Sequence, residues 1–290
     1  MRQIFTILLL LTFSGKPSFS QVTYLSRLID NNDGLSNSCI NTVFQDSDDL
    51  MWFGTWDGLN LYNGTSMHVF NYGKEIARNY LSSNIILNID EDQNRNIWVG
   101  TVEGVSKIDK QTGKLTNYFY DNQKANSTGF VLTIDKQGKI FAAHRNTSNI
   151  SYYNPSTDTF VDCNVKGISG MIADIKVDRS GNLWVLKNPQ SLELYRPSAS
   201  GFQKSANLPA VKDIVKLFYV NQQIYYTTSD GSLYRINNPL APEKLIKLPH
   251  EVRSITYYQN HYIFAWSSKG IGEYTTDFKP DPFISKDITS

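Results

Sequence analysis

Short apolar stretches alternate with polar turns along the whole chain, and one such pattern recurs at a nearly constant interval. Its clearest copy is Asn96–Thr101, of sequence NIWVGT, and the next clearest is Met51–Thr55, of sequence MWFGT. One large residue of each copy serves as a marker. The markers are separated by 46, 43, 43, 41 and 39 residues, and they are Trp52, Trp98, Phe141, Trp184, Tyr225 and Phe264. A repeat of about 40 residues is typical of propellers and solenoids.

Each repeat predicts four short antiparallel strands joined by polar turns. In the second repeat the expected strands are residues 85–90, 97–101, 105–108 and 115–119. The turn between the second and third strands carries an acidic residue followed by glycine, as in Glu103-Gly104 here and Asp57-Gly58 in the first repeat. Four short strands every 40 or so residues indicate an all-β propeller with four-stranded antiparallel blades, rather than a β-sandwich or a parallel β-helix.

Six repeats are visible, and the two ends of the chain bear on a seventh. Tyr24–Leu28 has the place of an outer strand that precedes the first repeat, and a fourth strand of the sixth repeat is expected around Pro282–Ser285. Either six blades close with a redundant N-terminal strand, or a seventh blade lacks its inner three strands. We favour the second interpretation. It predicts a seven-bladed propeller with its last blade incomplete in this chain, which would then be an N-terminal fragment of a longer protein.

The first 20 residues predict a signal peptide. Met1-Arg2 provides a charged start, an apolar run extends from Ile4 to Phe13, and small residues lead to Ser20. Cleavage near Ser20 would export residues 21–290, the predicted propeller domain. No later stretch approaches the roughly 20 apolar residues of a membrane span. Cys39 and Cys163 are too few for a disulfide scaffold, and we expect no bridge between them.

The charge balance argues against a general attraction to nucleic acid or to anionic membranes. The chain has 28 basic and 27 acidic side chains, so its formal net charge is +1. We also expect no metal, cofactor or catalytic set. The four histidines occupy different places in the repeat, and the sequence has no nucleophile elbow, zinc-binding helix or phosphate-binding loop.

The first two repeats resemble the two-component regulator propeller repeat. The stretches that carry the resemblance are Asp33–Ser36, Trp52–Thr55, Asp57–Gly64, Leu81–Asn84 and Trp98–Thr101. The resemblance is strong through residue 120 and looser beyond. There the Trp-x-Gly-Thr core is replaced by other sequences, so the later repeats support the fold more than the family.

This resemblance implies the periplasmic sensor region of a hybrid two-component system of the Bacteroidetes type. Such proteins combine two seven-bladed propellers, a β-sandwich, one membrane span, a sensor histidine kinase, a receiver and a DNA-binding region, and they usually detect oligosaccharides. This sequence holds none of the later parts, so we expect the region itself to be no enzyme and to contact no nucleic acid. The implied partners are an oligosaccharide and the downstream domains of a parent protein anchored in the inner membrane, with a homodimer left open.

We expect a ligand at one end of the blades. In a propeller, the turns between second and third strands lie on the same face as the connections between blades, around the mouth of the central channel. These turns supply an exposed indole for stacking on a sugar ring and polar groups for hydrogen bonds. The candidate residues are Trp56, Asp57, Glu103, His144, Arg145, Lys187, Asn188 and Trp266. The marker Trp and Gly residues are expected to serve packing instead.

Two alternatives to a sugar-binding sensor stay open. One is an interaction or dimerisation scaffold, in which a propeller face packs on another domain or on a second copy. The other, which we favour least, is a propeller lyase or glycosidase. His144 and Arg145 would then be the pair to examine.

Overall fold

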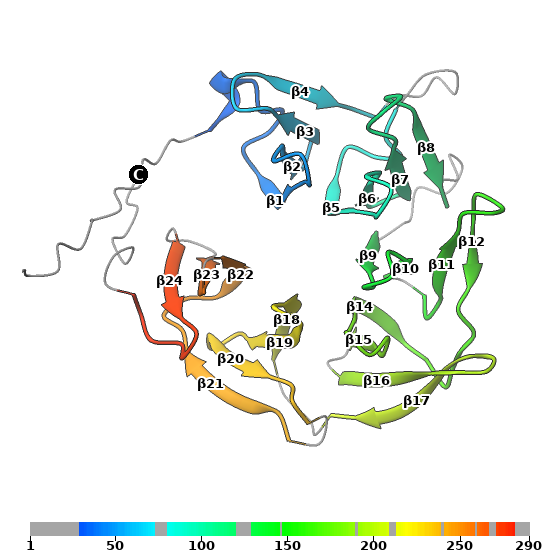
Figure 1. Ribbon diagram of the computed structural model, residues 1–290, viewed down its shortest axis with the longest axis vertical. Coiled ribbons are helices and arrows are strands. Elements are labelled where there is room, and N and C mark those ends of the chain that lie inside the picture. The colour runs from blue at the N-terminus through cyan, green and yellow to red at the C-terminus, as the bar shows by residue number, and fades with distance from the viewer. Residues whose placement is uncertain are drawn as a thin grey trace, which may run out of the picture.

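The computed structural model is an all-β propeller in which six sheets, the blades, surround a central opening (Figure 1). It describes residues 29–72, 80–119, 129–145, 147–188, 191–208, 213–238, 241–258, 260–266 and 271–281. The predicted signal peptide and the strands expected at 24–28 and 282–285 lie outside these residues. Within them, no helix has the length and hydrophobicity needed to cross a bilayer.

The first three blades have four antiparallel strands each, numbered from the channel outwards. They are β1 (Ile40–Gln45), β2 (Met51–Thr55), β3 (Gly58–Tyr62) and β4 (Met67–Phe70) in blade 1, β5 (Ile86–Glu91), β6 (Ile97–Thr101), β7 (Val105–Ile108) and β8 (Leu115–Tyr118) in blade 2, and β9 (Phe130–Ile134), β10 (Ile140–His144), β11 (Ile150–Asn154) and β12 (Thr159–Asp162) in blade 3. A short 3-10 helix, η1 (Asn31–Asp33), precedes β1.

The remaining blades follow in the same order around the opening. They contain β14 (Met171–Val177), β15 (Leu183–Asn188), β16 (Ser191–Ser198) and β17 (Gly201–Asn207) in blade 4, β18 (Ile214–Val220), β19 (Gln223–Thr228), β20 (Ser232–Arg235) and β21 (Glu243–Lys247) in blade 5, and β22 (Val252–Tyr258), β23 (His261–Trp266) and β24 (Ile271–Thr275) in blade 6. The predicted propeller is confirmed, and blades 1, 2, 3 and 5 have the predicted four strands.

Two blades depart from the four-strand expectation. Blade 4 has a fifth strand, because β13 (Val165–Lys166) follows the outer strand of blade 3 and pairs in parallel with β17. This pairing covers part of an outer edge that would otherwise leave backbone groups unpaired. Blade 6 has three strands within the described residues, and an isolated bridge joins Tyr274 to Pro280 beyond β24.

The marker tryptophans fill the space between each blade and the next. Trp52, Trp98 and Trp184 are at most 4% exposed, and each belongs to an apolar cluster shared with the following blade. Each indole N–H donates to an aspartate six residues earlier, at 2.8 to 2.9 Å. In blade 2 this aspartate is Asp92, which also accepts two backbone N–H groups of its own turn. One carboxylate therefore fixes both the turn and the marker side chain.

The marker of blade 6 corrects the sequence prediction. The β-bulge in each inner strand fixes the register, and it aligns Ile263, not Phe264, with the marker Tyr225 of blade 5. Phe264 is fully buried, but it packs in the cluster shared with blade 5, on the opposite face of the sheet from the marker position. The sequence favoured Phe264 because the other five markers are aromatic.

Glycines stand where a side chain would collide with the next blade. A Cβ at Gly100 would lie 2.3 Å from Asn88 Oδ1 and 2.7 Å from the carbonyl oxygen of Phe130 in blade 3. A Cβ at Gly54 would lie 2.5 Å from Cγ2 of Ile86 in blade 2. The prediction that these glycines serve close packing is confirmed.

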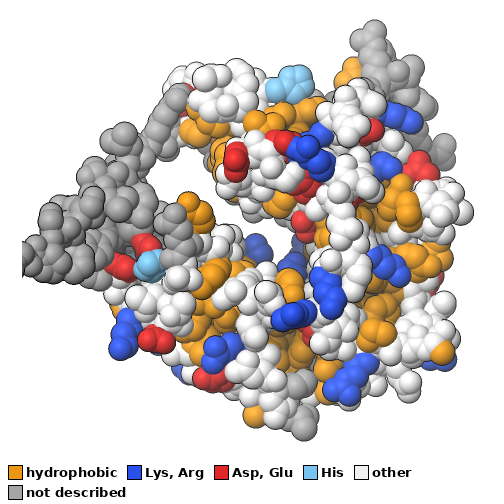
Figure 2. Space-filling model, viewed as in Figure 1, with side chains coloured by type: hydrophobic (Ala, Val, Ile, Leu, Met, Phe, Trp, Pro, Cys, Tyr) orange, Lys and Arg blue, Asp and Glu red, His pale blue; other side chains and the backbone are white. Residues whose placement is uncertain are grey.

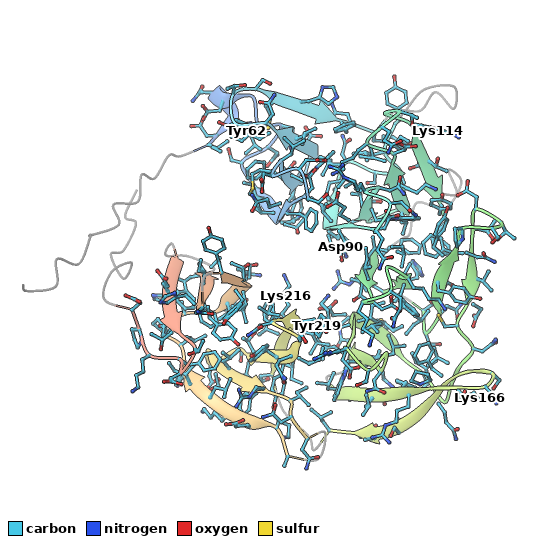
Figure 3. The ribbon with its side chains drawn as sticks, viewed as in Figure 1. Tyr62, Asp90, Lys114, Lys166, Lys216 and Tyr219 are labelled. Carbon is cyan, nitrogen blue, oxygen red and sulfur yellow. The ribbon has the colours of Figure 1, made fainter. Side chains whose placement is uncertain are left out.

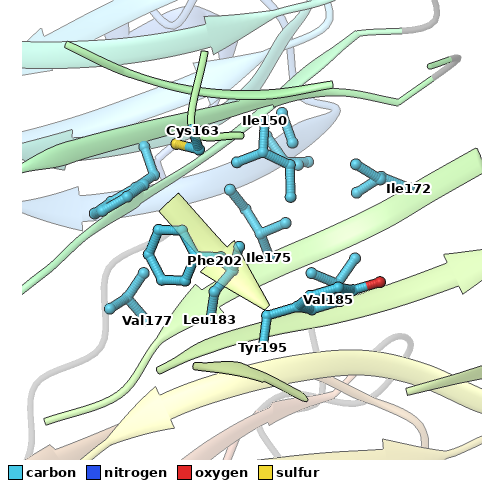
Figure 4. Packing of buried hydrophobic residues seen from close by; sticks show 12 residues of the cluster. Ile150, Cys163, Ile172, Ile175, Val177, Leu183, Val185, Tyr195 and Phe202 are labelled. Atoms are coloured by element: carbon cyan, nitrogen blue, oxygen red, sulfur yellow. The ribbon is translucent and has the colours of Figure 1, made fainter. Parts of the chain in front are cut away.

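The described residues form five apolar cores, one between each pair of consecutive blades from 1 to 6. Figure 4 shows the core between blades 3 and 4. Between blade 6 and blade 1 the described ring has a gap (Figure 1). Val43, whose place in blade 1 faces this gap, is 50% exposed, whereas its counterparts in the other blades are 0 to 7% exposed. These counterparts are Ile89, Leu132, Ile175, Leu217 and Ile255.

Removing the carboxylate beneath a marker tryptophan is expected to destabilise the fold. In Asp92→Asn an amide N–H would face the indole N–H of Trp98, so the free energy of unfolding should fall by about 1–3 kcal/mol. Asp135→Asn is the matched control. Asp135 accepts the corresponding two backbone N–H groups of the turn in blade 3, but the marker there, Phe141, has no side-chain N–H to donate. Urea denaturation followed by tryptophan fluorescence measures both variants. Equal losses in the two would contradict this role of the indole bond.

Candidate functional site

The turns between second and third strands lie beside the connections between blades, as the sequence predicted. In blade 1 the backbone N–H of Gly58 donates to the carbonyl oxygen of Asn84 at 2.8 Å, and the Asn84 side chain donates to Asp57 Oδ1 at 2.8 Å. In blade 3 the Arg145 N–H donates to the carbonyl oxygen of Gly129, on the connection that enters the same blade, at 2.9 Å. The bond from the Trp56 N–H to the carbonyl oxygen of Cys39 is its equivalent in blade 1. Backbone hydrogen bonds therefore hold both sets of loops at one end of the propeller.

Three predicted site residues lie on the turns of blades 1 and 2. Trp56 is 58% exposed, and its indole N–H donates to Asn41 Oδ1 at 2.9 Å. Asp57 is exposed and accepts from Asn84, while Glu103 is half-buried and its backbone N–H donates to the Thr101 hydroxyl. An exposed indole held in place by one hydrogen bond provides a flat surface on which a sugar ring can stack.

The turn of blade 3 carries His144 and Arg145. The His144 ring packs on Phe130, with centroids 4.8 Å apart. Burial lowers the pKa of His144, which favours the neutral imidazole at neutral pH. Arg145 is exposed beside it. The pair offers a neutral ring and a permanent cation to a ligand at the channel mouth.

Two further predicted residues, Lys187 and Trp266, each contact another residue of their own blade. Lys187 Nζ lies 3.0 Å from Glu193 Oε1, a carboxylate that is almost fully buried. Trp266 is half-buried, stacks on Phe264 with centroids 5.7 Å apart, and packs on the core between blades 5 and 6. Asn188, next to Lys187, is exposed. The eight predicted residues are thus distributed over five blades and do not form one compact cluster.

The wall of the central channel carries charged groups that the sequence analysis did not single out. Figure 2 shows the opening in the space-filling view, and Figure 3 places Asp90 and Lys216 beside it. Strand registers place Asp90 of blade 2 and Lys176 of blade 4 at one inner-strand position, where blades 1 and 5 have Phe44 and Phe218. A charged residue at a position where other repeats have an aromatic residue was the sequence signal that could have identified Asp90 and Lys176.

Asp90 is a carboxyl group with a strongly shifted pKa. Burial raises the pKa of Asp90 to about 6, although the backbone N–H of Glu91 and the Lys176 ammonium both act to lower it. A carboxyl group that exchanges its proton near neutral pH on the wall of a channel has the character of a functional group.

Three cations gather on the wall formed by blades 4, 5 and 6. Burial is the largest influence that lowers the pKa of Lys216, the Asp174 carboxylate acts against it, and Lys176 and Arg253 add to the lowering. The side chain of Lys216 is open to the channel, yet protein atoms surround it on several sides. Its Nζ donates to the carbonyl oxygen of Arg253 at 3.0 Å, and Lys176 Nζ lies 3.3 Å from Asp174 Oδ1.

His261, Glu273 and Asp281 form a further cluster in blade 6 whose side chains could hold a metal ion. Nδ1 of His261 lies 3.3 Å from Glu273 Oε1, and Nε2 lies 3.1 Å from Asp281 Oδ2. The two ring nitrogens thus face different carboxylates. A metal ion would need one ring nitrogen and both carboxylates to converge on a single point.

A sequence model described as the two component regulator propeller matches residues 34–57, from the end of η1 to the turn after β2. The resemblance noted in the sequence is confirmed for this stretch of blade 1. Histidine kinase P4 from Formosa agariphila is 23% identical over 152 residues, which cover 50% of this chain and 11% of that kinase.

Two solved structures illustrate the range of proteins that share the fold. One is the extracellular domain of a hybrid two component system from B. thetaiotaomicron, with 18% identity and a TM-score of 0.70 over 88% of this chain and 36% of that chain. The other is a catalytically inactive virginiamycin B lyase from Staphylococcus aureus with quinupristin, with 13% identity and a TM-score of 0.63 over 87% of this chain and 88% of that chain. The chain spans about a third of the extracellular domain, and at these identities both likenesses concern the fold.

The raised pKa of Asp90 predicts a pH-dependent effect on stability. An aspartate whose pKa rises from 3.8 to about 6 on folding favours the folded state below pH 3.8, and this contribution is lost as the pH rises through 6. The free energy of unfolding of Asp90→Asn should therefore exceed that of the parent chain by about 3 kcal/mol at pH 8 and should equal it below pH 4. Urea denaturation of both proteins from pH 4 to pH 8 measures the difference. A difference that stays constant with pH would contradict the shift.

Proposed function

We propose that this chain is the sensor region of a hybrid two-component system, exported after cleavage near Ser20, and that it detects an oligosaccharide without catalysing a reaction. The observation that supports this most is the combination of the regulator propeller repeat at residues 34–57 with a fold shared over 88% of the chain with the extracellular domain of such a system. In this proposal, ligand binding acts on a sensor histidine kinase of the same parent protein, anchored in the inner membrane, through rearrangement of domains.

The proposed contact surface for the oligosaccharide is the end of the propeller that bears Trp56. Its indole is the most exposed aromatic side chain among the eight candidates, and Asp57, His144 and Arg145 lie on the turns at the same end. An aromatic platform surrounded by hydrogen-bonding groups of both charges matches the alternating apolar and hydroxyl-bearing faces of a sugar ring.

We further propose that the complete ring has seven blades and that the seventh occupies the gap between blades 6 and 1. The exposure of Val43 supports this, because every counterpart in blades 2 to 6 is covered by the preceding blade. In a Val43→Cys, Cys39→Ser variant, a thiol reagent should label residue 43 rapidly in this chain and slowly in a longer version that supplies the missing strands. Rapid labelling in both would contradict a seventh blade.

A scaffold function is the second candidate, and the same uncovered face of blade 1 favours it. If that face binds a second copy of the chain, light scattering should show a dimer that a Val43→Asp substitution converts to a monomer. If the unsubstituted chain is a monomer at all concentrations measured, a scaffold function through homodimerisation is contradicted.

The sensing proposal predicts a defined effect of Trp56. Isothermal titration calorimetry against a panel of plant and host oligosaccharides should identify a ligand, and Trp56→Ala should weaken its binding about tenfold or more through loss of the stacking surface. Tyr258→Ala is the matched control, because Tyr258 is 62% exposed at the end of β22, next to the turn between the first and second strands. An equal effect of the two substitutions, or no ligand in the whole panel, would contradict the proposal.

A further inference from the structure

The geometry points to an anion-binding site on the wall of the central channel, formed by Lys216 with Lys176 and Arg253, which takes the carboxylate or sulfate group of an acidic oligosaccharide. This inference rests on the proposed sensing function and names the chemical class of its ligand. The three side chains come from β18, β14 and β22, the inner strands of consecutive blades. Figure 2 shows basic side chains along the opening, and Figure 3 places Lys216 there.

Lys216 is the member of this group that has no carboxylate. Its Nζ donates to the carbonyl oxygen of Arg253, a neutral acceptor, and the described residues give it no ion pair. Lys176 lies 3.3 Å from Asp174, and Arg253 lies 3.4 Å from Glu251. Lys216 is therefore the one cation of the three that has no ion pair among the described residues.

An ammonium group held among protein atoms without a counter-ion is unfavourable. The lowered pKa of Lys216 agrees with this, since burial causes it and the two neighbouring cations add to it. An anionic group within hydrogen-bond distance of Lys216 would compensate for the burial and also for the repulsion from Lys176 and Arg253. A neutral hydroxyl group would do neither, so the site discriminates by charge.

The negative charge of Asp90, on another part of the channel wall, would orient a bound ligand. Asp90 belongs to β5 of blade 2, whereas the cations belong to blades 4, 5 and 6. When Asp90 is ionised it repels an anion, so the acidic group of a ligand would be directed to the side of Lys216. Uncharged parts of the same oligosaccharide could then extend toward the turns at the channel mouth.

Calorimetry of the 290-residue chain tests the inference with three probes: digalacturonate, its neutral counterpart galactobiose, and inorganic sulfate. Digalacturonate should bind at least tenfold more tightly than galactobiose, and more weakly as the salt concentration rises. Lys216→Gln should weaken digalacturonate and sulfate binding about tenfold, while Lys216→Arg, which keeps the charge, should retain most of it. Lys114→Gln is the matched control, because Lys114 is exposed and lies away from the opening (Figure 3).

The outcomes separate this inference from the function on which it rests. If both sugars bind equally and Lys216→Gln changes neither, the channel site is overturned while oligosaccharide sensing stands. If only sulfate binds, and Lys216→Gln abolishes its binding, the anion site stands but its assignment to an acidic oligosaccharide is overturned, and the oligosaccharide panel decides separately on the sensing function. If no probe binds, or if Lys114→Gln matches Lys216→Gln in its effect, the anion site is overturned.

Discussion

Each blade of this propeller is a small sheet with two apolar faces, and each face is stable only when a neighbouring blade covers it. The marker side chains meet this requirement on one face, and the aliphatic residues of the next inner strand meet it on the other. Volume matters more than identity at the marker position, since Phe141 and Tyr225 are as well buried as Trp52. The repeats can therefore lose the Trp-x-Gly-Thr sequence and keep the same architecture.

The sequence was sufficient to predict the propeller because a buried aromatic residue in every blade leaves a signal at a regular interval. It was not sufficient for blade 6. Ile263 and Phe264 are adjacent and both apolar, and only the β-bulge in β22 shows which of them faces away from blade 5. Strand β13 escaped prediction for a related reason. A two-residue strand is defined by its partner, and its partner β17 is distant in the sequence.

The positions of the candidate residues in the fold could be predicted where the signal was local, and their role in binding stays a prediction. Turn chemistry located Trp56 and Asp57 at the end of the blades that bears the connections between blades, because an Asp-Gly pair identifies a turn without knowledge of the rest of the fold. The channel residues Asp90, Lys176 and Lys216 depend on how three separate blades are arranged around one axis, which no single stretch of sequence records. Lys187 shows the converse case, since its ion pair with Glu193 removes much of the freedom that an exposed turn residue would have.

The parallel pairing of β13 with β17 has a mechanical consequence. The strand continues from the outer edge of blade 3 but belongs to the ladder of blade 4, so these two blades cannot be pulled apart without breaking main-chain hydrogen bonds as well as an apolar core. Within the described residues, blades 3 and 4 are joined by a shared strand, whereas a gap separates blades 6 and 1. The ring therefore does not have uniform stiffness. Strain applied to its rim would be taken up more readily where neighbouring blades share no strand, so the path of the backbone would decide in which direction the ring can flex.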